Sequence, residues 1–162
     1  MLTNYDLMEI SKNNKVAIDE INYKDKLKSI KSIKNKNKNV NVIINLQNST
    51  SYGNGTHWVC LVKRGNHFFY FDSFGATPPR VVVDYCEKIS NIGLLAMNNY
   101  IIQNLNTDVC GYYCFALLHY LKNTTEKNLF EKANEFINIF EDDTKNNEKI
   151  LFKYFKYKKI KI

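Results

Sequence analysis

Several features that define other protein classes are missing from this sequence of 162 residues. No apolar run approaches the ~20 residues that a membrane-spanning helix needs. The first residues have neither the basic start nor the apolar stretch of a signal peptide. Glycine and proline are scarce, at 6 and 2 residues, and no internal repeat is visible. We therefore expect a soluble, intracellular protein.

The four cysteines also lack the spacing of a metal site. None of Cys60, Cys86, Cys110 and Cys114 belongs to a CxxC pair, and no pair drawn from them and the three histidines has the spacing of a zinc finger or ribbon. We expect no metal, and four free thiols in a reducing compartment.

What the sequence does contain is enough apolar material for a packed core. Hydrophobic residues make up 44% and aromatic residues 14%, which excludes a disordered chain. At this length we expect a single domain over residues 1–162. The formal net charge of +7 has two interpretations. It favours contact with a polyanion such as nucleic acid, or it reflects a Lys- and Asn-rich composition of the kind that an A/T-biased coding sequence produces.

The hydrophobic pattern predicts an α+β fold with a central, mostly antiparallel sheet flanked by helices. Thr3 and Asp6 have the spacing of a helix capping box, so a helix begins there. The predicted strands are the runs rich in β-branched and aromatic residues: 42–46, 57–64, 67–72 and 100–103. The later helices are expected at 81–90, at 110–121 and in two amphipathic stripes at 129–140 and 150–155.

A lysine-rich segment at residues 24–38 carries seven lysines and has apolar residues at a spacing of three. This spacing suggests a helix or an irregular arm with one apolar edge. The charge run fits a nucleic-acid contact, but a solvated loop is the more common outcome for such a run.

Cys110 is the candidate nucleophile because it stands between a polar connector and the start of an apolar helix. The unpaired N–H groups at a helix N-terminus favour the thiolate, which is the reactive form of cysteine. The same N–H groups can bind the oxyanion that forms when a carbonyl is attacked. The alternative is a buried structural cysteine that begins a core helix, an interpretation that suits Cys114, Cys60 and Cys86.

Among the three histidines, His57 is the best candidate for the base. It stands at the start of a predicted central strand, after a Gly-containing loop and beside Trp58. His119 lies too far along the helix that begins at Cys110, and His67 starts a strand after a turn, where it faces solvent.

Two further residues can complete the site. A turn at 65–66 would bring Asp72 close to His57 on the neighbouring strand, where a carboxylate fixes the orientation of an imidazole. Gln103 precedes Cys110 by seven residues, and its amide can donate to the oxyanion beside the Cys110 backbone N–H. Taken alone, Asp72 would be an ordinary turn residue and Gln103 an ordinary polar one.

The order His, Asp, Gln, Cys resembles that of the adenovirus-type (adenain-like) maturation proteases, especially those of virophages and Maverick/Polinton-type elements. The resemblance rests on three segments in order: GTHW (55–58), YFDSFG (70–75) and QNLNTDVCGYYC (103–114). It spans about half of the chain. These enzymes share a papain-related group with the SUMO-specific proteases. The adenovirus enzymes have Glu at the position of Asp72. Val109 before the cysteine and the spacing of Gln103 depart from the SUMO branch and favour the viral branch.

The resemblance implies a cysteine endopeptidase with His57 as base, Asp72 as orienting acid, Gln103 as oxyanion donor and Cys110 as nucleophile. It further implies a substrate cleft beside Trp58 and cleavage of viral capsid precursors after Gly-Gly or Gly-X. The enzyme would act as a monomer at the viral assembly site in the host cell and be packaged in the virion. DNA or a short viral peptide would assist it. Lys153, Lys156, Lys158, Lys159, Lys161 and the segment at 24–38 are the candidate DNA contacts.

Two other functions stay open at this point. One is an isopeptidase that removes ubiquitin-like modifiers, which also end in Gly-Gly. The other is a non-enzymatic basic protein associated with DNA or capsids, in which Cys110 is structural.

Overall fold

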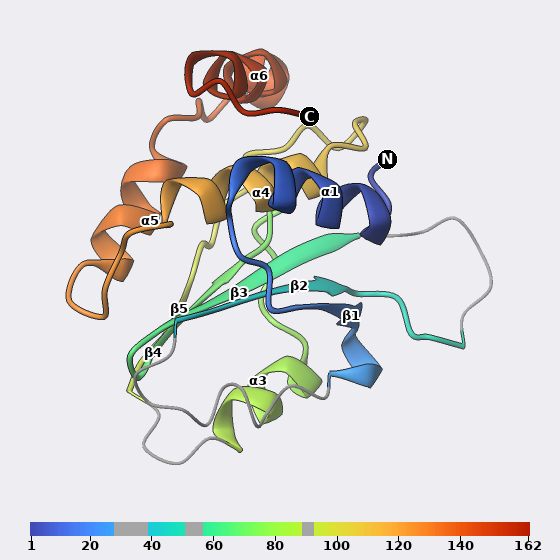
Figure 1. Cartoon of the computed structure of the whole chain (residues 1–162), viewed down its shortest axis with the longest axis vertical. Helices are drawn as coiled ribbons and strands as arrows, with labels where there is room; N and C mark the ends of the chain where they lie inside the picture. Colours follow the sequence, from blue (N-terminus) through green and yellow to red (C-terminus); the bar gives the residue numbers. More distant parts are fainter. Residues whose placement is uncertain (28–38, 51–56, 89–92) are drawn as a thin grey trace.

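A five-stranded sheet forms the centre of the molecule (Figure 1). The computed structural model describes residues 1–27, 39–50, 57–88 and 93–162. The strands lie in the sheet in sequence order, and they are β1 (Glu20–Tyr23), β2 (Val40–Asn45), β3 (Trp58–Arg64), β4 (His67–Phe71) and β5 (Leu95–Met97). All residues of β2 and β3 are buried, as the continuous apolar runs in their sequences predict for strands covered on both faces.

The predicted α+β class is confirmed, and the three central strands are antiparallel as expected. The β3–β4 hairpin turns at Gly65, whose φ of 56° suits a residue without a Cβ atom. The outer strands differ from the central ones, because β1 runs parallel to β2 and β5 runs parallel to β4. Each of these edge strands returns to the sheet by a longer connection instead of a tight turn.

Helices cover the two faces of the sheet unequally. In Figure 1, α1, α4, α5 and α6 lie on one side of the sheet and α3 lies on the other. Their bounds are α1 (Asn4–Asn14), α3 (Arg80–Glu87), α4 (Cys110–Tyr120), α5 (Leu129–Ile137) and α6 (Asn147–Tyr157), with short 3₁₀ turns at Lys24–Lys26 and Thr144–Asn146. The larger apolar core therefore lies between the sheet and α4. None of the helices in this described part of the chain is both long and apolar enough to cross a bilayer.

The first helix, α1, begins as the sequence predicts. The Thr3 side chain accepts a hydrogen bond from the Asp6 N–H, and the Asp6 carboxylate accepts one from the Thr3 N–H at 2.7 Å. At the other end of α1, the Asn14 amide forms two hydrogen bonds of 2.8 Å with the backbone of Lys161. The two ends of the described chain are therefore joined.

The strand expected at residues 100–103 is not formed, and the strand that pairs with β4 is β5, at Leu95–Met97. The backbone N–H groups of Ile102 and Gln103 both donate to the Ser73 carbonyl, at 2.9 and 3.0 Å, so they join no strand. Gly75 permits this approach, because a Cβ atom there would lie 2.5 Å from the Tyr100 carbonyl carbon.

Two other expected segments lie partly outside the described residues. Of the lysine-rich segment at 24–38, the structure describes a 3₁₀ turn at Lys24–Lys26, and residues 28–38 are outside it. The helix expected at 81–90 is α3, which spans Arg80–Glu87, and residues 89 and 90 are outside the description.

A buried arginine closes the far end of α4. Arg64, 1% exposed, donates to the carbonyl of Leu121 at 3.1 Å, to the Thr124 hydroxyl at 3.2 Å and to the Asn41 side-chain oxygen at 2.9 Å. Burial lowers the pKa of Arg64 to about 10, although Asp19 opposes this effect, so the side chain stays charged at neutral pH. Because its positive charge meets the carbonyl end of the α4 dipole, Arg64 anchors this helix to β3.

Replacing Arg64 should therefore destabilise the protein strongly. We expect Arg64→Met to lower the free energy of unfolding by about 2–4 kcal/mol, because it leaves buried oxygens without a donor. The control is the chain's other arginine, Arg80, whose ion pairs with Asp84 (2.9 Å) and Glu87 (3.5 Å) are exposed. Arg80→Met should cost less than about 1 kcal/mol. Urea unfolding measures both, and similar values for the two variants would contradict this role of Arg64.

Candidate active site

Cys110 is the first residue of α4, as the sequence predicts. The residue at its N-cap is Val109, whose apolar side chain cannot cap the helix. The first N–H groups of α4 are thus free of a capping side chain and are suited to a negative charge. The Cys110 side chain is buried, and its sulfur accepts a hydrogen bond from the Trp58 backbone N–H at 3.5 Å. This contact joins the helix that carries the thiol to the strand that follows His57.

His57 and Asp72 lie together, as the hairpin register leads one to expect. The His57 Nε2 atom is 2.8 Å from the Asp72 Oδ1 atom. Asp72 is 1% exposed, and the same oxygen accepts the Phe74 N–H at 2.8 Å. The Asn98 side chain binds the N–H and the carbonyl of Asp72, which holds its backbone at the end of β4. The Asp72 carboxylate is therefore held in place with its Oδ1 atom facing the His57 imidazole.

The Cys110 side chain as well as Asp72 acts on the pKa of His57, which lies between the acid and the thiol. Burial alone lowers the pKa of His57, but hydrogen bonds to Asp72 and to Cys110, and the charges of these partners, raise it from 6.5 to about 9. The ring of Phe74 stacks on the imidazole with centroids 4.8 Å apart. Because Nε2 faces Asp72, Nδ1 is the nitrogen left for the thiol. An imidazolium beside a cysteine sulfur is the partner that a nucleophilic thiol needs.

Gln103 is buried close to the start of α4, and its amide is held in one orientation. The Ser73 hydroxyl donates to the Gln103 Oε1 atom at 2.6 Å. The Gln103 Nε2 atom donates to the Thr107 carbonyl at 2.8 Å and lies 3.3 Å from the Thr107 hydroxyl. One N–H of the amide is thus engaged firmly, and the other has only this longer contact. Both acceptors belong to Thr107, and the longer hydrogen bond, to its hydroxyl, is the one that an oxyanion would replace.

The remaining candidates have other environments. His119 lies in α4 and hydrogen-bonds the Tyr154 hydroxyl at 2.8 Å, away from Cys110. His67, expected to face solvent, is half-buried and stacks on Phe130. Trp58 is buried and donates its indole N–H to the Leu2 carbonyl at 2.8 Å. Whether Trp58 binds substrate stays a prediction, as do the catalytic roles of the four residues above.

All four cysteines are free. Burial raises the pKa of Cys86 to about 12 and raises that of Cys114, whose thiol donates to the Trp58 carbonyl at 3.4 Å. Across residues 1–27, 39–50, 57–88 and 93–162, no three histidine, cysteine or acidic side chains converge as metal ligands would.

Three residues that support the site are not predicted by the sequence patterns: Ser73, Phe74 and Asn98. Ser73 and Phe74 belong to the segment YFDSFG, in which only Asp72 was singled out, and the alternation of side chains along that segment was the available signal. Asn98 follows β5, a strand that the sequence did not indicate, and the neighbouring residues in the sequence form no motif that predicts a role for it.

No protein-family model and no curated protein sequence matches the chain. Its fold is similar to that of the ASFV pS273R protease in two crystal structures. One matches with a TM-score of 0.54 and 15% identity over 84% of this chain and 65% of the other. The second matches with a TM-score of 0.58 and 16% identity over 100% of this chain and 68% of the other. The chain thus spans about two thirds of the ASFV protease.

The fold is also similar to that of AvrA delL154 in a structure with IP6 and CoA, with a TM-score of 0.51 and 14% identity over 94% of this chain and 67% of the other. These likenesses place the chain in the α+β fold of the SUMO-protease and adenovirus-protease type, as the sequence motifs implied. At identities of 14–16%, these likenesses describe the fold.

The bridging position of His57 predicts a selectively reactive thiol. We expect iodoacetamide to modify Cys110 at pH 7 at least ~10-fold faster than Cys86, and Asp72→Asn to slow that reaction by about 10-fold, because the imidazolium loses its carboxylate partner. Peptide mapping by mass spectrometry measures each rate. The control is Asp84→Asn, which removes an exposed carboxylate on α3. Equal rates in the two variants would show that Asp72 does not act on the thiol.

The raised pKa of His57 also predicts how stability changes with pH. Since folding raises this pKa from 6.5 to about 9, its stabilising effect is fully present below about pH 6.5 and is lost as the pH rises through 9. Relative to His57→Gln, the wild type should lose on the order of 2 kcal/mol of unfolding free energy between pH 6 and 10. Urea unfolding at several pH values checks this. A difference that is constant or grows with pH would contradict it.

Proposed function

We propose that this chain is a cysteine endopeptidase in which Cys110 is the nucleophile and His57 the acid–base group. The observation that carries the proposal is the position of His57, which pairs with the buried carboxylate of Asp72 and immediately precedes Trp58, whose backbone N–H binds the Cys110 sulfur at the start of α4. A thiol, an imidazole and an orienting acid in this order are the parts that nucleophilic hydrolysis of an amide needs. The similarity in fold to the ASFV protease supports the proposal.

The reaction follows from this geometry. The Cys110 thiolate attacks the scissile carbonyl carbon, and the oxyanion is stabilised by the Gln103 amide and the Cys110 backbone N–H. The imidazolium of His57 gives its proton to the departing amine, which leaves a thioester on Cys110. Water then attacks the thioester as His57 takes its proton. The acid is released, and the Cys110–His57 pair is restored.

The narrower form of the proposal is that the substrates are capsid precursors of a virus or virophage, cut after Gly-Gly or Gly-X during virion maturation. The segments GTHW, YFDSFG and QNLNTDVCGYYC support this form, because they resemble the maturation proteases. The enzyme would then act at the viral assembly site and be packaged in the virion. Ubiquitin-like modifiers also end in Gly-Gly. If such conjugates are the substrates, the same cleavage preference makes the protein an isopeptidase.

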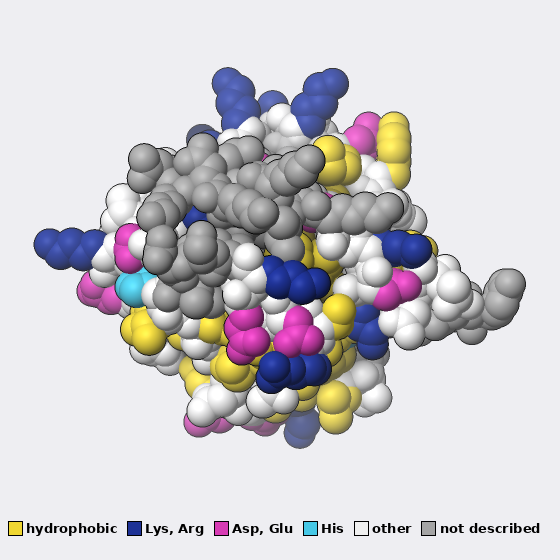
Figure 2. Space-filling view, turned by 90° about the horizontal axis from the view of Figure 1, so that it is seen from below, with side chains coloured by type: hydrophobic (Ala, Val, Ile, Leu, Met, Phe, Trp, Pro, Cys, Tyr) yellow, Lys and Arg dark blue, Asp and Glu magenta, His cyan; other side chains and the backbone are white. Residues whose placement is uncertain are grey.

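DNA is the first proposed activator of the enzyme, and a short viral peptide is the second. Figure 2, which views the molecule from below, shows lysine and arginine side chains interspersed with acidic ones, so the described part of that face offers no continuous basic surface. The lysines of α6 and the residues after it are exposed instead, at 149, 153, 156, 158, 159 and 161. An exposed run of lysines of this kind suits the phosphate backbone.

Acyl transfer is the second candidate function, and the CoA in the AvrA structure favours it. Cys110 would take the acyl group from an acyl-CoA and release CoA, and an amine would then take the acyl group from Cys110 and restore the thiol. This candidate shares the first covalent step with hydrolysis and differs in the donor.

The decisive experiment follows the cleavage of a Gly-Gly peptide by the purified protein, with and without DNA. We expect Cys110→Ala to lower kcat/KM by at least ~10³-fold, and Gln103→Leu to lower it by about 10²-fold, because an oxyanion donor is lost. Cys86→Ala removes a buried thiol on α3 and should keep the activity.

Parallel assays with a folded ubiquitin-like conjugate and with acetyl-CoA plus an amine separate the two other enzymatic candidates. Cleavage that persists in Cys110→Ala would refute the nucleophile. A wild-type protein that acts on no substrate and has an unreactive Cys110 would favour the structural, non-enzymatic interpretation.

A further inference from the structure

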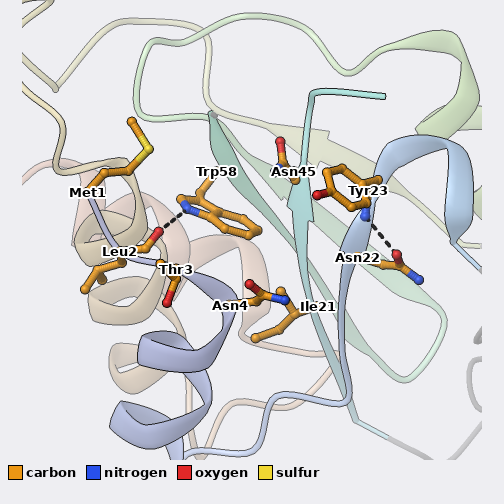
Figure 3. Close-up of a pocket in the computed structure, with 9 residues that line it drawn as sticks. All are labelled: Met1, Leu2, Thr3, Asn4, Ile21, Asn22, Tyr23, Asn45 and Trp58. Carbon is orange, nitrogen blue, oxygen red and sulfur yellow. Dashed lines mark hydrogen bonds between the residues drawn. The ribbon is translucent and has the colours of Figure 1, made fainter. Parts of the chain in front are cut away.

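A pocket of about 250 Å³ opens beside Trp58, between the segment that precedes α1 and the ends of β1 and β2 (Figure 3). Its nine lining residues include the apolar side chains of Leu2, Ile21 and Trp58 and the amides of Asn4, Asn22 and Asn45, and none of the nine side chains is charged. Pockets that enclose small-molecule ligands usually measure roughly 300–1,000 Å³. The space beside Trp58 is smaller and suits a single side chain.

The pocket is separated from the nucleophile by one layer of side chains. Leu2 and Trp58 form two of its walls, and both contact Gly111, the residue after Cys110. A Cβ atom at Gly111 would lie 3.3 Å from the side chains of each. An extended peptide advances ~3.3 Å per residue. A polypeptide bound at Cys110 would therefore reach the pocket within about two to four residues of its scissile bond.

Asn45 points to the chemistry of the occupant. This residue is 6% exposed, and its Oδ1 atom accepts the Gln47 N–H at 2.9 Å, which fixes the amide so that its NH₂ group is the free end. Within the described residues, that NH₂ group has no acceptor at hydrogen-bond distance. In the described part of the chain, the buried side-chain groups without a partner are the Tyr70 and Tyr85 hydroxyls, so the Asn45 NH₂ group is accessible from the pocket that it lines and can donate to a bound carbonyl oxygen.

We infer that this pocket binds an uncharged amide side chain, glutamine or asparagine, of the polypeptide substrate. The inference rests on the proposed endopeptidase function and adds a specificity site to it. The side-chain carbonyl would accept from Asn45, and the aliphatic stem would lie against Trp58 and Ile21. A charged side chain would be desolvated here without a counter-ion, and a purely apolar one would leave the Asn45 donor unpaired.

The first test compares Gly-Gly peptides that differ at one position outside the Gly-Gly pair, with Gln, Leu or Lys placed up to four residues from the cleavage point. We expect kcat/KM for the best Gln peptide to exceed that for its Leu counterpart by about 10-fold, the worth of one such hydrogen bond. Asn45→Asp keeps the acceptor for Gln47 and replaces the NH₂ donor with an anionic oxygen. This variant should lose the preference for Gln and gain activity on Lys.

The control variant is Asn128→Asp, since the Asn128 Oδ1 atom likewise accepts a backbone N–H, from Thr125 at 2.7 Å, beyond the opposite end of α4. Asn128→Asp should keep the wild-type order of substrates. The iodoacetamide rate of Cys110 should be equal in both variants, which shows that the site itself is intact. If Asn45→Asp cleaves the three peptides in the wild-type ratios, the inference is wrong.

A binding test separates this inference from the proposed function. Trp58 is the only tryptophan of the chain and lines the pocket, so its fluorescence reports occupancy in the inactive variant Cys110→Ala. We expect the Gln peptide to shift this emission at concentrations at least ~10-fold below those needed for the Leu peptide. Gln-dependent binding without any cleavage by the wild type would keep the amide site and refute the endopeptidase. Cleavage by the wild type, together with equal binding of the Gln and Leu peptides, would keep the endopeptidase and refute the amide site.

Discussion

The contact between α4 and the first residue of β3 is the constraint on which the rest of the site depends. The backbone of Trp58 receives two sulfur contacts from α4, because its N–H donates to Cys110 and its carbonyl accepts from Cys114 one turn later. The strand thus fixes both the height and the rotation of the helix. Since His57 immediately precedes this point, the base and the thiol are placed by one piece of backbone pairing. Arg64, at the other end of β3, binds the far end of the same helix.

The second support of the site is the turn that follows β4. Asp72 points to His57, and Ser73, the next residue, points to Gln103, so two adjacent side chains orient the base and the amide proposed for the oxyanion. The Ser73 carbonyl also receives the backbone N–H groups of Ile102 and Gln103. Gly75 closes the turn at a φ of 71° and leaves room for this segment. The orientation of the base, His57, and that of the proposed oxyanion donor, Gln103, therefore both depend on the same turn after β4.

Local chemistry explains which parts of this arrangement could be predicted from the sequence. The capping box of Thr3 and Asp6, the hairpin at Gly65 and the helix that begins at Cys110 each depend on neighbouring residues, and all three are present. The segment at 100–103 looked like a strand because of its apolar residues, yet its N–H groups bind a carbonyl about thirty positions earlier in the chain. The short strand β5 and the Asn98 contact with Asp72 also depend on partners distant in sequence, and no local pattern announces them.

The pairing of Asn14 with the backbone of Lys161 bears on when the molecule can complete its fold. These residues are 147 positions apart, which makes this one of the most non-local contacts in the chain. Closing so long a loop is slow and comes late in folding. During synthesis, α1 lacks this partner until residue 161 has left the ribosome, and the segment before α1 covers Trp58 and Gly111. The stretch around Lys161 therefore completes the support of α1, and a nascent chain that ends before it lacks part of the frame that surrounds the thiol.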